Sequence, residues 1–376
     1  MTAYGVTTGE AQAVTVDPAL ELAFQQTVPR HFVHRAAVAE VFLTDTVALG
    51  GDRFLIGAQW PRDHALYHPD GQGLSDPLLF AETIRQSLVC LAHRYYDVPL
   101  THRFVGTGMD FTITDPEALL VGTGPQRAVL SGEWTWVGNR PPRRFGMRLE
   151  VVLSLAGREC GRGSLTVVAV DERTYRTLRG RGGGGRPDGS GDAFGGGPDG
   201  APGAPGVPGV PGVPGAPGAP AVAVRRRIRP PLVGRLRTKD SVLAAGPADG
   251  EWQLLVDPGH AILFDHPTDH VPLMALLEGV RQLGHLLVHQ PVSRPGGGGG
   301  TRADARTLLA VDTRCLAFAE LDAPITLVVR GGAGSPGASG RAELTIDAVQ
   351  EGVLLLTSES VWGRGTTTGA DQGHRR

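Results

Sequence analysis

Two segments of the chain carry hydrophobic residues at helical spacing. In residues 78–93 and again in residues 274–289, apolar side chains recur every three or four positions. Pro77 and Pro272 stand just before these segments, where a proline is tolerated because the first N–H groups of a helix have no partner within it. The pattern predicts two long, largely buried helices.

After each predicted helix come runs of alternating or β-rich residues, which indicate strands. The runs are 103–114, 128–138, 143–157 and 161–172 in the first half, and 308–319, 323–331, 341–350 and 352–362 in the second. With a strand or two before each helix, each half reads as one helix followed by an antiparallel meander. The predicted fold class is α+β: a tandem (double) hotdog, each half a long central helix wrapped by a curved antiparallel β-sheet.

The two halves also share residues at matching positions, which indicates an internal duplication. Before the helices, Val33, Arg35, Glu40 and Leu43 recur as Val233, Arg235, Asp240 and Leu243. On the helices, Glu82, Arg85, Gln86 and His93 recur as Glu278, Arg281, Gln282 and His289.

Glycine and proline are concentrated between the halves, where repeated Gly-Ala-Pro and Gly-Val-Pro triplets cannot bury enough apolar area to offset the entropy of ordering. We therefore expect five parts. They are an N-terminal extension (1–28), a first hotdog repeat (29–179), a disordered Gly/Pro-rich linker (180–224), a second hotdog repeat (225–363) and a disordered tail (364–376).

Charge and cysteine content exclude several classes of protein. The 36 basic residues nearly cancel the 38 acidic ones, so the chain lacks the field that nucleic-acid binding usually requires. No leader-like or membrane-spanning stretch is evident, and Cys90, Cys160 and Cys315 stand far apart without CxxC pairing. We expect a cytoplasmic protein with no cofactor, no nucleic acid and no membrane among its partners, while a homo-oligomer remains open.

Each predicted helix carries Glu, Arg and Gln at positions i, i+3 and i+4, on one face. These residues are Glu82, Arg85 and Gln86 in the first helix and Glu278, Arg281 and Gln282 in the second. One interpretation is an intrahelical ion pair at the rim of the core, since buried charges must be paired. The other is a functional site, which is favoured because the trio recurs while many apolar neighbours have changed.

Loops rich in titratable groups precede both helices, at residues 59–71 and 264–272. Their histidines could enter a cleft at a helix N-terminus, where backbone N–H groups can polarise a carbonyl. The alternative is that they hydrogen-bond the loop backbone. Histidines four apart on a proline-rich loop are a weak zinc signal, so we expect no metal. The candidate substrate-binding residues are Gln86, Gln282, His64, His266 and His270.

Four blocks of sequence carry a resemblance to a known family: HRAAVAEVFLTD (34–45), GAQWPRDHALYHP (57–69), DPLLFAETIRQSLVCLAHRYYDVPL (76–100) and DHPTDHVPLMALLEGVRQ (265–282). In this order they resemble the A-factor biosynthesis family, the tandem-hotdog γ-butyrolactone synthases of actinomycetes. The resemblance runs from about residue 30 to residue 362.

The resemblance implies an acyltransferase of secondary metabolism and quorum sensing. A β-ketoacyl group would pass from an acyl carrier protein thioester to the hydroxyl of dihydroxyacetone phosphate, and the ester would later become a γ-butyrolactone signal. The implied catalytic residues are Glu82, Arg85, Glu278 and Arg281. Leu273 stands where the family pattern predicts a glycine, which would obstruct a thioester at the second cleft, so we expect the chemistry in the cleft of Glu82 and Arg85.

The chemistry can also be argued from the residues alone. Acyl transfer from a thioester needs an enzyme that positions the alcohol, removes its proton and stabilises an oxyanion. A carboxylate on a core helix is expected to have a raised proton affinity, which suits Glu82 or Glu278 as general base. An arginine one turn on offers a bidentate grip on phosphate. The absence of GxSxG and of a His-paired cysteine favours direct transfer over a covalent acyl-enzyme.

Two alternatives remain open: a hotdog thioesterase or 3-hydroxyacyl dehydratase, and a non-catalytic acyl-binding regulatory protein in which the glutamates merely pair with their arginines. The arginine beside each glutamate favours a phosphorylated acceptor. For an acidic carrier protein, candidate docking groups are Arg140, Arg143 and Arg144, and Arg225, Arg226, Arg227 and Arg229.

Overall fold

One continuous antiparallel sheet of 12 strands forms the body of the protein. The computed structural model describes residues 22–182, 226–248, 250–289, 306–332 and 340–364. The strands of the first repeat are β1 (Leu43–Gly50), β2 (Arg53–Trp60), β3 (Arg103–Ile113), β4 (Gln126–Trp136), β5 (Arg144–Leu155) and β6 (Arg158–Val170). Those of the second are β7 (Leu243–Ala245), β8 (Glu251–Leu254), β9 (Arg306–Cys315), β10 (Ile325–Gly331), β11 (Ala342–Gln350) and β12 (Val353–Arg364).

The order of the strands shows the duplication directly. Across the sheet they run β1-β2-β4-β5-β6-β3 and then β9-β12-β11-β10-β8-β7, so the second half repeats the first in reverse. The halves join where β3 pairs with β9, with Asp110 opposite Asp312. All eight strand runs predicted after the helices are strands.

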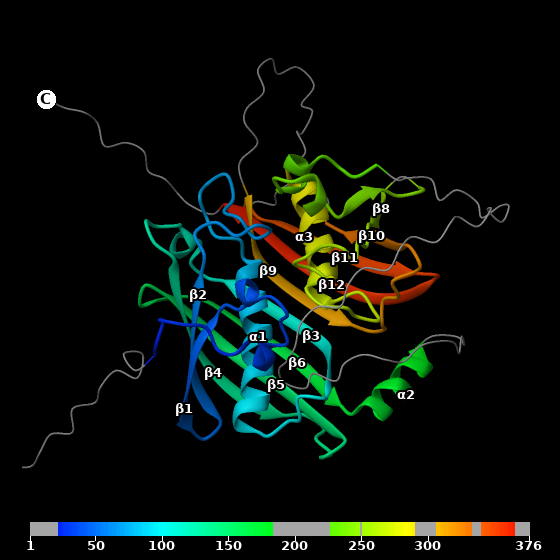
Figure 1. Ribbon diagram of the computed structural model, residues 1–376. Helices are drawn as coiled ribbons and strands as arrows, with labels where there is room; N and C mark the ends of the chain where they lie inside the picture. Colours follow the sequence, from blue (N-terminus) through cyan, green and yellow to red (C-terminus); the bar gives the residue numbers. More distant parts are fainter. Residues whose placement is uncertain (1–21, 183–225, 249, 290–305, 333–339, 365–376) are drawn as a thin grey trace, which may run out of the picture.

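The two predicted helices are present as α1 (Leu78–Tyr95) and α3 (Leu273–Val288), and both lie along the same face of the sheet (Figure 1). Almost every side chain of α1 from Leu78 to His93 is buried, including Glu82 and Gln86. In β4, Ala128, Leu130 and Trp134 alternate with exposed residues and are buried. A helix enclosed by a curved sheet in each half confirms the double hotdog fold.

The described residues also form short 3-10 helices: η2 (Arg30–Val33), η3 (Val38–Glu40), η4 (Pro116–Leu119), η5 (Pro230–Val233) and η6 (Thr238–Asp240). Segment η2 packs on α1 and η5 packs on α3. Arg35 and Arg235 follow the C-cap residues of η2 and η5, so both arginines lie beside a central helix.

A third helix, α2 (Glu172–Gly182), was not predicted, and the expected linker begins within it. It belongs to the first repeat but binds the second: Arg179 makes two hydrogen bonds to Glu320, at 2.6 and 2.7 Å, and the Tyr175 hydroxyl donates to Asp269 at 2.8 Å. These contacts fix α2 against the second repeat. The rest of the expected linker, like the expected tail beyond Arg364 and residues 1–21, lies outside the described residues.

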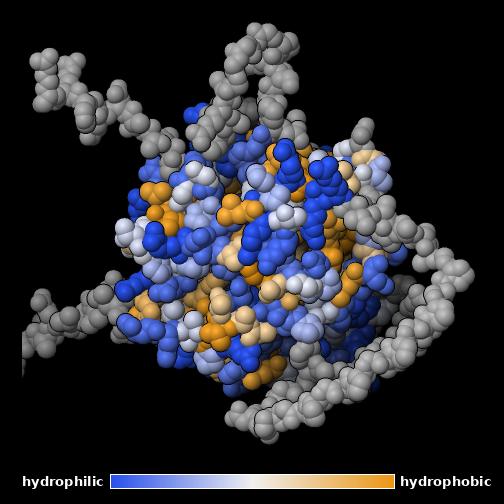
Figure 2. Space-filling model, turned by 45° about the horizontal axis from the view of Figure 1, so that its top comes forward, coloured by the Kyte–Doolittle hydropathy of each residue, from blue (hydrophilic) through white to orange (hydrophobic). Residues whose placement is uncertain are grey.

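The surface shows hydrophobic residues in small groups separated by hydrophilic ones on the face drawn in Figure 2. Cys90 and Cys160 are buried free thiols, and Cys315 is a partly buried one. No helix in the described part of the chain is long and apolar enough to span a membrane.

Candidate active site

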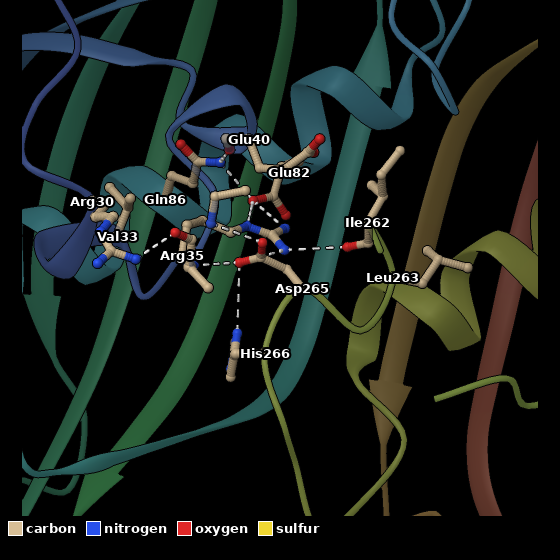
Figure 3. A network of polar contacts seen from close by, with 12 residues as sticks. Arg30, Val33, Arg35, Glu40, Glu82, Gln86, Ile262, Leu263, Asp265 and His266 are labelled. Atoms are coloured by element: carbon tan, nitrogen blue, oxygen red, sulfur yellow. Dashed lines mark hydrogen bonds and ion pairs between the residues drawn. The ribbon is translucent and has the colours of Figure 1, made fainter. Parts of the chain in front are cut away.

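Glu82, on α1, is the centre of a buried ion-pair cluster (Figure 3). Its carboxylate accepts hydrogen bonds from Nε and Nη2 of Arg85, at 2.9 and 2.8 Å, and lies 2.6 Å from Nη2 of Arg35. Nε2 of Gln86 donates to it at 2.7 Å. We call Arg35, Glu82, Arg85 and Gln86 the first cluster.

A loop of the second repeat closes the first cluster. Asp265 accepts the backbone N–H groups of Ala36 and Ala37, at 2.6 and 3.0 Å, beside Arg35 (Figure 3). The Nη1 group of Arg35 lies 3.4 Å from the carbonyl oxygen of Ile262. The cluster therefore lies at the boundary between the repeats.

The second cluster, formed by Arg235, Glu278, Arg281 and Gln282, has the same plan but a different pairing. Arg235, with its side chain fully buried, grips Glu278 with Nε and Nη2 at 2.6 and 2.5 Å. Its Nη1 reaches Asp76 of the first repeat at 2.7 Å. Each cluster is thus completed by an aspartate of the opposite repeat, Asp265 for the first and Asp76 for the second.

Arg281 differs from Arg85. The predicted intrahelical ion pair exists between Arg85 and Glu82, but no hydrogen bond or ion pair joins the described side chains of Arg281 and Glu278. Arg281 instead donates to the carbonyl oxygen of Val233 at 2.9 Å and lies 3.4 Å from Asp76. Its charge is only partly compensated.

The glycine at position 234 makes room for this arrangement. Gly234 adopts a left-handed conformation, with φ of 64°, where the first repeat has His34 with φ of 50°. A Cβ at residue 234 would lie 2.8 Å from His285 and 3.1 Å from Nη2 of Arg281. Arg281 and His285 can approach this turn because it has no side chain.

The two glutamine side chains are fully used within the protein. Gln86 accepts from the N–H of Phe42 at 2.9 Å and donates to the carbonyl oxygen of Glu40 at 2.7 Å, besides its bond to Glu82. Gln282 makes the equivalent bonds to Val242, Asp240 and Glu278. Both tie a central helix to the segment that enters β1 or β7.

The expectation of a raised proton affinity is wrong for Glu82. Burial alone would raise the pKa of this carboxyl, but the adjacent charges and hydrogen bonds of Arg35 and Arg85 lower it to about 2. Burial is likewise outweighed at Asp76, whose pKa falls to about 2 because of Arg281 and Arg235. Burial lowers the pKa of Arg281, and neighbouring Arg235 lowers it further, in keeping with incomplete compensation.

The start of α1 is already occupied. The N–H of Leu78 donates to the Asp76 carboxylate at 2.9 Å, and the N–H groups of Leu79 and Phe80 donate to the carbonyl oxygens of Asp76 and Pro77. The free amides that were expected to polarise a carbonyl are therefore not found at the start of α1. Because Asp76 also contacts Arg235 and Arg281, α1 begins beside the second cluster. The loop that leads into α3 reaches the first cluster, so Leu273 begins a helix whose N-terminal loop belongs to the first cluster rather than the second.

The predicted histidines have different environments. His64 accepts the N–H groups of Leu66 and Tyr67 on Nδ1 and lies 3.2 Å from Glu40 on Nε2. His260 does the same in the second repeat, with Ile262, Leu263 and Asp240. His64 therefore holds a loop, which is the alternative interpretation given above, and its counterpart in the second repeat is His260.

His266 and His270 lie on the loop before α3. The side chain of His266 is 46% exposed, with Nδ1 3.7 Å from Asp265. Nδ1 of His270 lies 2.9 Å from Asp269 and 3.1 Å from the hydroxyl of Tyr175, at the contact with α2. Among the described residues, no group of three His, Cys, Asp or Glu side chains could hold a metal ion.

Several residues of the site were missed. Arg35 and Arg235 were visible as repeated positions but were assigned no role, although both bind the glutamates. Asp76 and Asp265 act across the boundary between the repeats, so spacing along the chain gave no signal of their contacts. A cavity beside the second cluster was also missed. It lies between the start of α1 and α3, and Asp76, Arg281 and His285 line it.

Comparison with known proteins gives a family match in both repeats. The family model described as the A-factor biosynthesis hotdog domain matches residues 16–171 and 220–368. A 2-oxo-3-(phosphooxy)propyl 3-oxoalkanoate synthase of Streptomyces virginiae is 36% identical over 259 residues, covering 68% of this chain and 75% of that relative. A protein of the same name from Streptomyces coelicolor is 30% identical over 333 residues, covering 88% and 89%.

Solved structures with a similar course of the chain include two thioesterases. A 12:0-ACP thioesterase from Umbellularia californica has a TM-score of 0.41 and 11% identity, covering 84% of this chain and 99% of that one. An acyl-CoA thioesterase II from Mycobacterium marinum has a TM-score of 0.39 and 12% identity, covering 90% and 99%.

Proposed function

The chain belongs to the A-factor biosynthesis hotdog family, and we propose that it is an acyltransferase that moves a 3-oxoacyl group from a thioester to a hydroxyl of dihydroxyacetone phosphate. The product is a 2-oxo-3-(phosphooxy)propyl 3-oxoalkanoate, a precursor of γ-butyrolactone signals. The observation that carries this function is the match of the family model to both repeats. It is supported by a relative that is named for this synthase activity and is covered over most of its length.

The glutamates are positioning residues in this proposal rather than bases. Glu82 is ionised and held by two arginines, so it is a weak proton acceptor at neutral pH. Glu278 is held just as tightly by Arg235. Each glutamate fixes the arginine that precedes its helix, Arg35 or Arg235, beside the arginine one turn further along the helix.

We assign the chemistry to the second cluster. Arg85 uses Nε and Nη2 on Glu82, whereas Arg281 is not paired with Glu278 and faces a cavity. Its guanidinium can therefore bind an anionic group of the substrate. This assignment differs from the sequence-based expectation, which favoured Glu82 and Arg85. That expectation assumed that Leu273 obstructs the site in its own half of the chain, whereas the loop before α3 reaches the first cluster.

The remaining candidates keep separate roles. Gln86, Gln282 and His64 act as scaffold, since their polar atoms are bound within the protein. His266 and His270 are partly accessible and remain candidates for contact with the donor.

The acyl donor is an acyl carrier protein thioester in this proposal, and the enzyme acts in the cytoplasm, where dihydroxyacetone phosphate is made. Arg140, Arg143 and Arg144 are exposed, as docking of an acidic carrier requires. Arg226 and Arg229 are exposed as well, while Arg227 is partly buried and donates to the carbonyl oxygen of Ser241. Arg225 lies outside the described residues.

The function is tested by incubating the protein with a β-ketoacyl carrier protein, with and without dihydroxyacetone phosphate, and analysing the products by mass spectrometry. The phosphorylated ester should form only when the acceptor is present. Release of free 3-oxo acid at the same rate with or without the acceptor would identify a thioesterase, and an unchanged thioester would identify a binding protein.

A further inference from the structure

Polar and charged residues are the majority of those that line the cavity beside the second cluster, together with the apolar Leu74, Leu308 and Trp362. The cavity lies between the start of α1 and α3 and is bordered by β9 and β12. Its titratable lining residues are His68, Asp70, Asp76, Arg281, His285, His289 and Arg306.

Two arginines of this lining have incomplete partners. Nη1 of Arg306 is buried and has no hydrogen-bond partner, and no carboxylate of a described residue lies within ion-pair distance of this guanidinium. Arg281 reaches Asp76 only at 3.4 Å. A buried cationic N–H without an acceptor is costly, so Arg306 favours an anionic oxygen in the cavity. The charge of Arg281, which is only partly compensated, favours the same kind of group.

The acidic residues of the lining are already engaged. Asp70 accepts from the hydroxyl of Thr307 at 2.7 Å and from the backbone N–H groups of Gln72 and Leu74. Asp76 is shared between Arg235 and the N–H of Leu78. Neither carboxylate fills the free position on Arg306.

His68 provides a hydrogen-bond acceptor rather than a cationic donor. Its Nδ1 lies 2.9 Å from the carbonyl oxygen of Pro69, which can only accept, so the proton of the neutral ring is on Nδ1. Its Nε2 is buried, and the part of the chain that the structure describes supplies no partner for it. His289, by contrast, uses both nitrogens, on the carbonyl oxygen of His285 and the N–H of Arg306. His68 thus presents an unused lone pair at the cavity, which suits it to accept a proton from a hydroxyl.

We propose that this cavity binds the phosphorylated acceptor, with Arg281 and Arg306 on the phosphate and Nε2 of His68 on the hydroxyl that attacks the thioester. The assignment rests on the acyltransferase function proposed above. It makes His68 a catalytic residue, although its neighbour His64 holds the loop.

The step balances with the two substrates alone. Nε2 of His68 takes the hydroxyl proton as the acceptor oxygen bonds to the thioester carbonyl carbon. The tetrahedral intermediate collapses, the C–S bond breaks, and the leaving thiolate takes the proton from the His68 imidazolium. The products are the ester and the free thiol, and His68 returns to its neutral form.

The phosphate subsite is tested by calorimetric binding to the full chain, independently of catalysis. Dihydroxyacetone phosphate and inorganic phosphate should bind to the wild type, and unphosphorylated dihydroxyacetone should bind much more weakly. Arg306→Gln should weaken binding of both phosphorylated ligands by about 10- to 100-fold, the loss expected for a charged hydrogen bond. Arg158→Gln, an exposed arginine paired with Asp115, is the matched control and should bind like the wild type.

The role of His68 is tested by His68→Gln with the same ligands and the carrier-protein substrate. The turnover number should fall by about 10²- to 10⁴-fold, while affinity for dihydroxyacetone phosphate stays within about threefold of the wild type. Unchanged phosphate affinity in folded Arg306→Gln, or undiminished turnover in His68→Gln, would overturn the assignment. If Arg306→Gln does not fold, a wild-type structure with bound phosphate decides, since the phosphate must lie against Nη1 of Arg306. A wild type that binds phosphate as described but transfers no acyl group would refute the function and leave the binding site standing.

Discussion

Arg235 of the second repeat and Asp76 of the first form a fully buried ion pair, with 2.7 Å between Nη1 and Oδ2. Asp76 also caps α1, and Arg235 also holds Glu278 on α3. A single pair of side chains therefore connects both central helices. Since neither residue can be solvated in its place, the two repeats are expected to fold as one cooperative unit.

Asp76→Asn should destabilise the protein strongly. Removing one partner of a buried ion pair leaves the other charge uncompensated, at a cost of about 3–5 kcal/mol. Glu159→Gln, which removes an exposed pair with Arg162, should cost less than about 1 kcal/mol. Urea denaturation of both variants measures the free energies of unfolding. Similar small losses for both would show that Asp76 does not join the repeats energetically.

Glu82→Gln should change how stability depends on pH. The folded pKa of Glu82, about 2, lies below the usual value of about 4.3, so its ionised form stabilises the fold above that value and the contribution is lost as pH falls towards 2. The wild type should be more stable than the variant at pH 7, and the difference should shrink below about pH 4. A difference that stays constant from pH 7 to pH 3, measured by urea denaturation, would contradict the account of Glu82.

His34→Asn should lose less stability than the wild type when the pH falls from neutral to mildly acidic values. Burial, then neighbouring His93 and Arg85, lower the pKa of His34 to about 3. Below about pH 6.5 the unfolded chain takes a proton that the folded protein refuses, which costs up to about 1.4 kcal/mol per pH unit. Asparagine tolerates the left-handed backbone of this residue. From pH 7 to pH 5 the free energy of unfolding should fall less in the variant than in the wild type. An equal or larger fall would argue against a neutral His34 in the folded protein.

Gly234→Ala should disturb the second cluster beyond ordinary backbone strain. A Cβ at residue 234 would meet His285 at 2.8 Å, whereas a Cβ at Gly250, which also has a positive φ, would have no atom within 4 Å. Gly250→Ala should therefore show only the left-handed penalty of about 1–2 kcal/mol. Gly234→Ala should be less stable than this control and should also raise KM for dihydroxyacetone phosphate. Equal melting temperatures and equal KM values for the two variants would mean that His285 and Arg281 move aside freely.

Local patterns predicted the elements of the fold well. The spacing of apolar residues gave α1 and α3, and alternation gave the strands that follow them, because these signals come from neighbours in sequence. The recurrence of Arg35 as Arg235 was visible too. Helix α2 was not, since Arg179 and Tyr175 hold it through partners in the other repeat.

The site was predicted only in part. Glu82 and Glu278 were found from their stripe on each helix, but spacing could not show that Arg35 and Arg235 would bind them. Nor could it show that the pKa of Glu82 would fall below its usual value because of Arg35 and Arg85. The expectation that each cluster lies at the start of the helix in its own repeat was also wrong. The start of α1 contacts the second cluster, and the loop before α3 contacts the first. These relationships depend on how two repeats meet, which a pattern within one repeat does not encode.

The central claim is that acceptor chemistry occurs at the second cluster, and steady-state kinetics of Arg281→Gln and Arg85→Gln with dihydroxyacetone phosphate test it most directly. Both variants should first be shown to have matched melting temperatures. The account predicts that Arg281→Gln raises KM for the acceptor by about 10- to 100-fold, as expected for a lost charged hydrogen bond, while Arg85→Gln changes it by less than about threefold. A large rise in Arg85→Gln with a normal KM in Arg281→Gln would contradict it and place the acceptor beside Glu82.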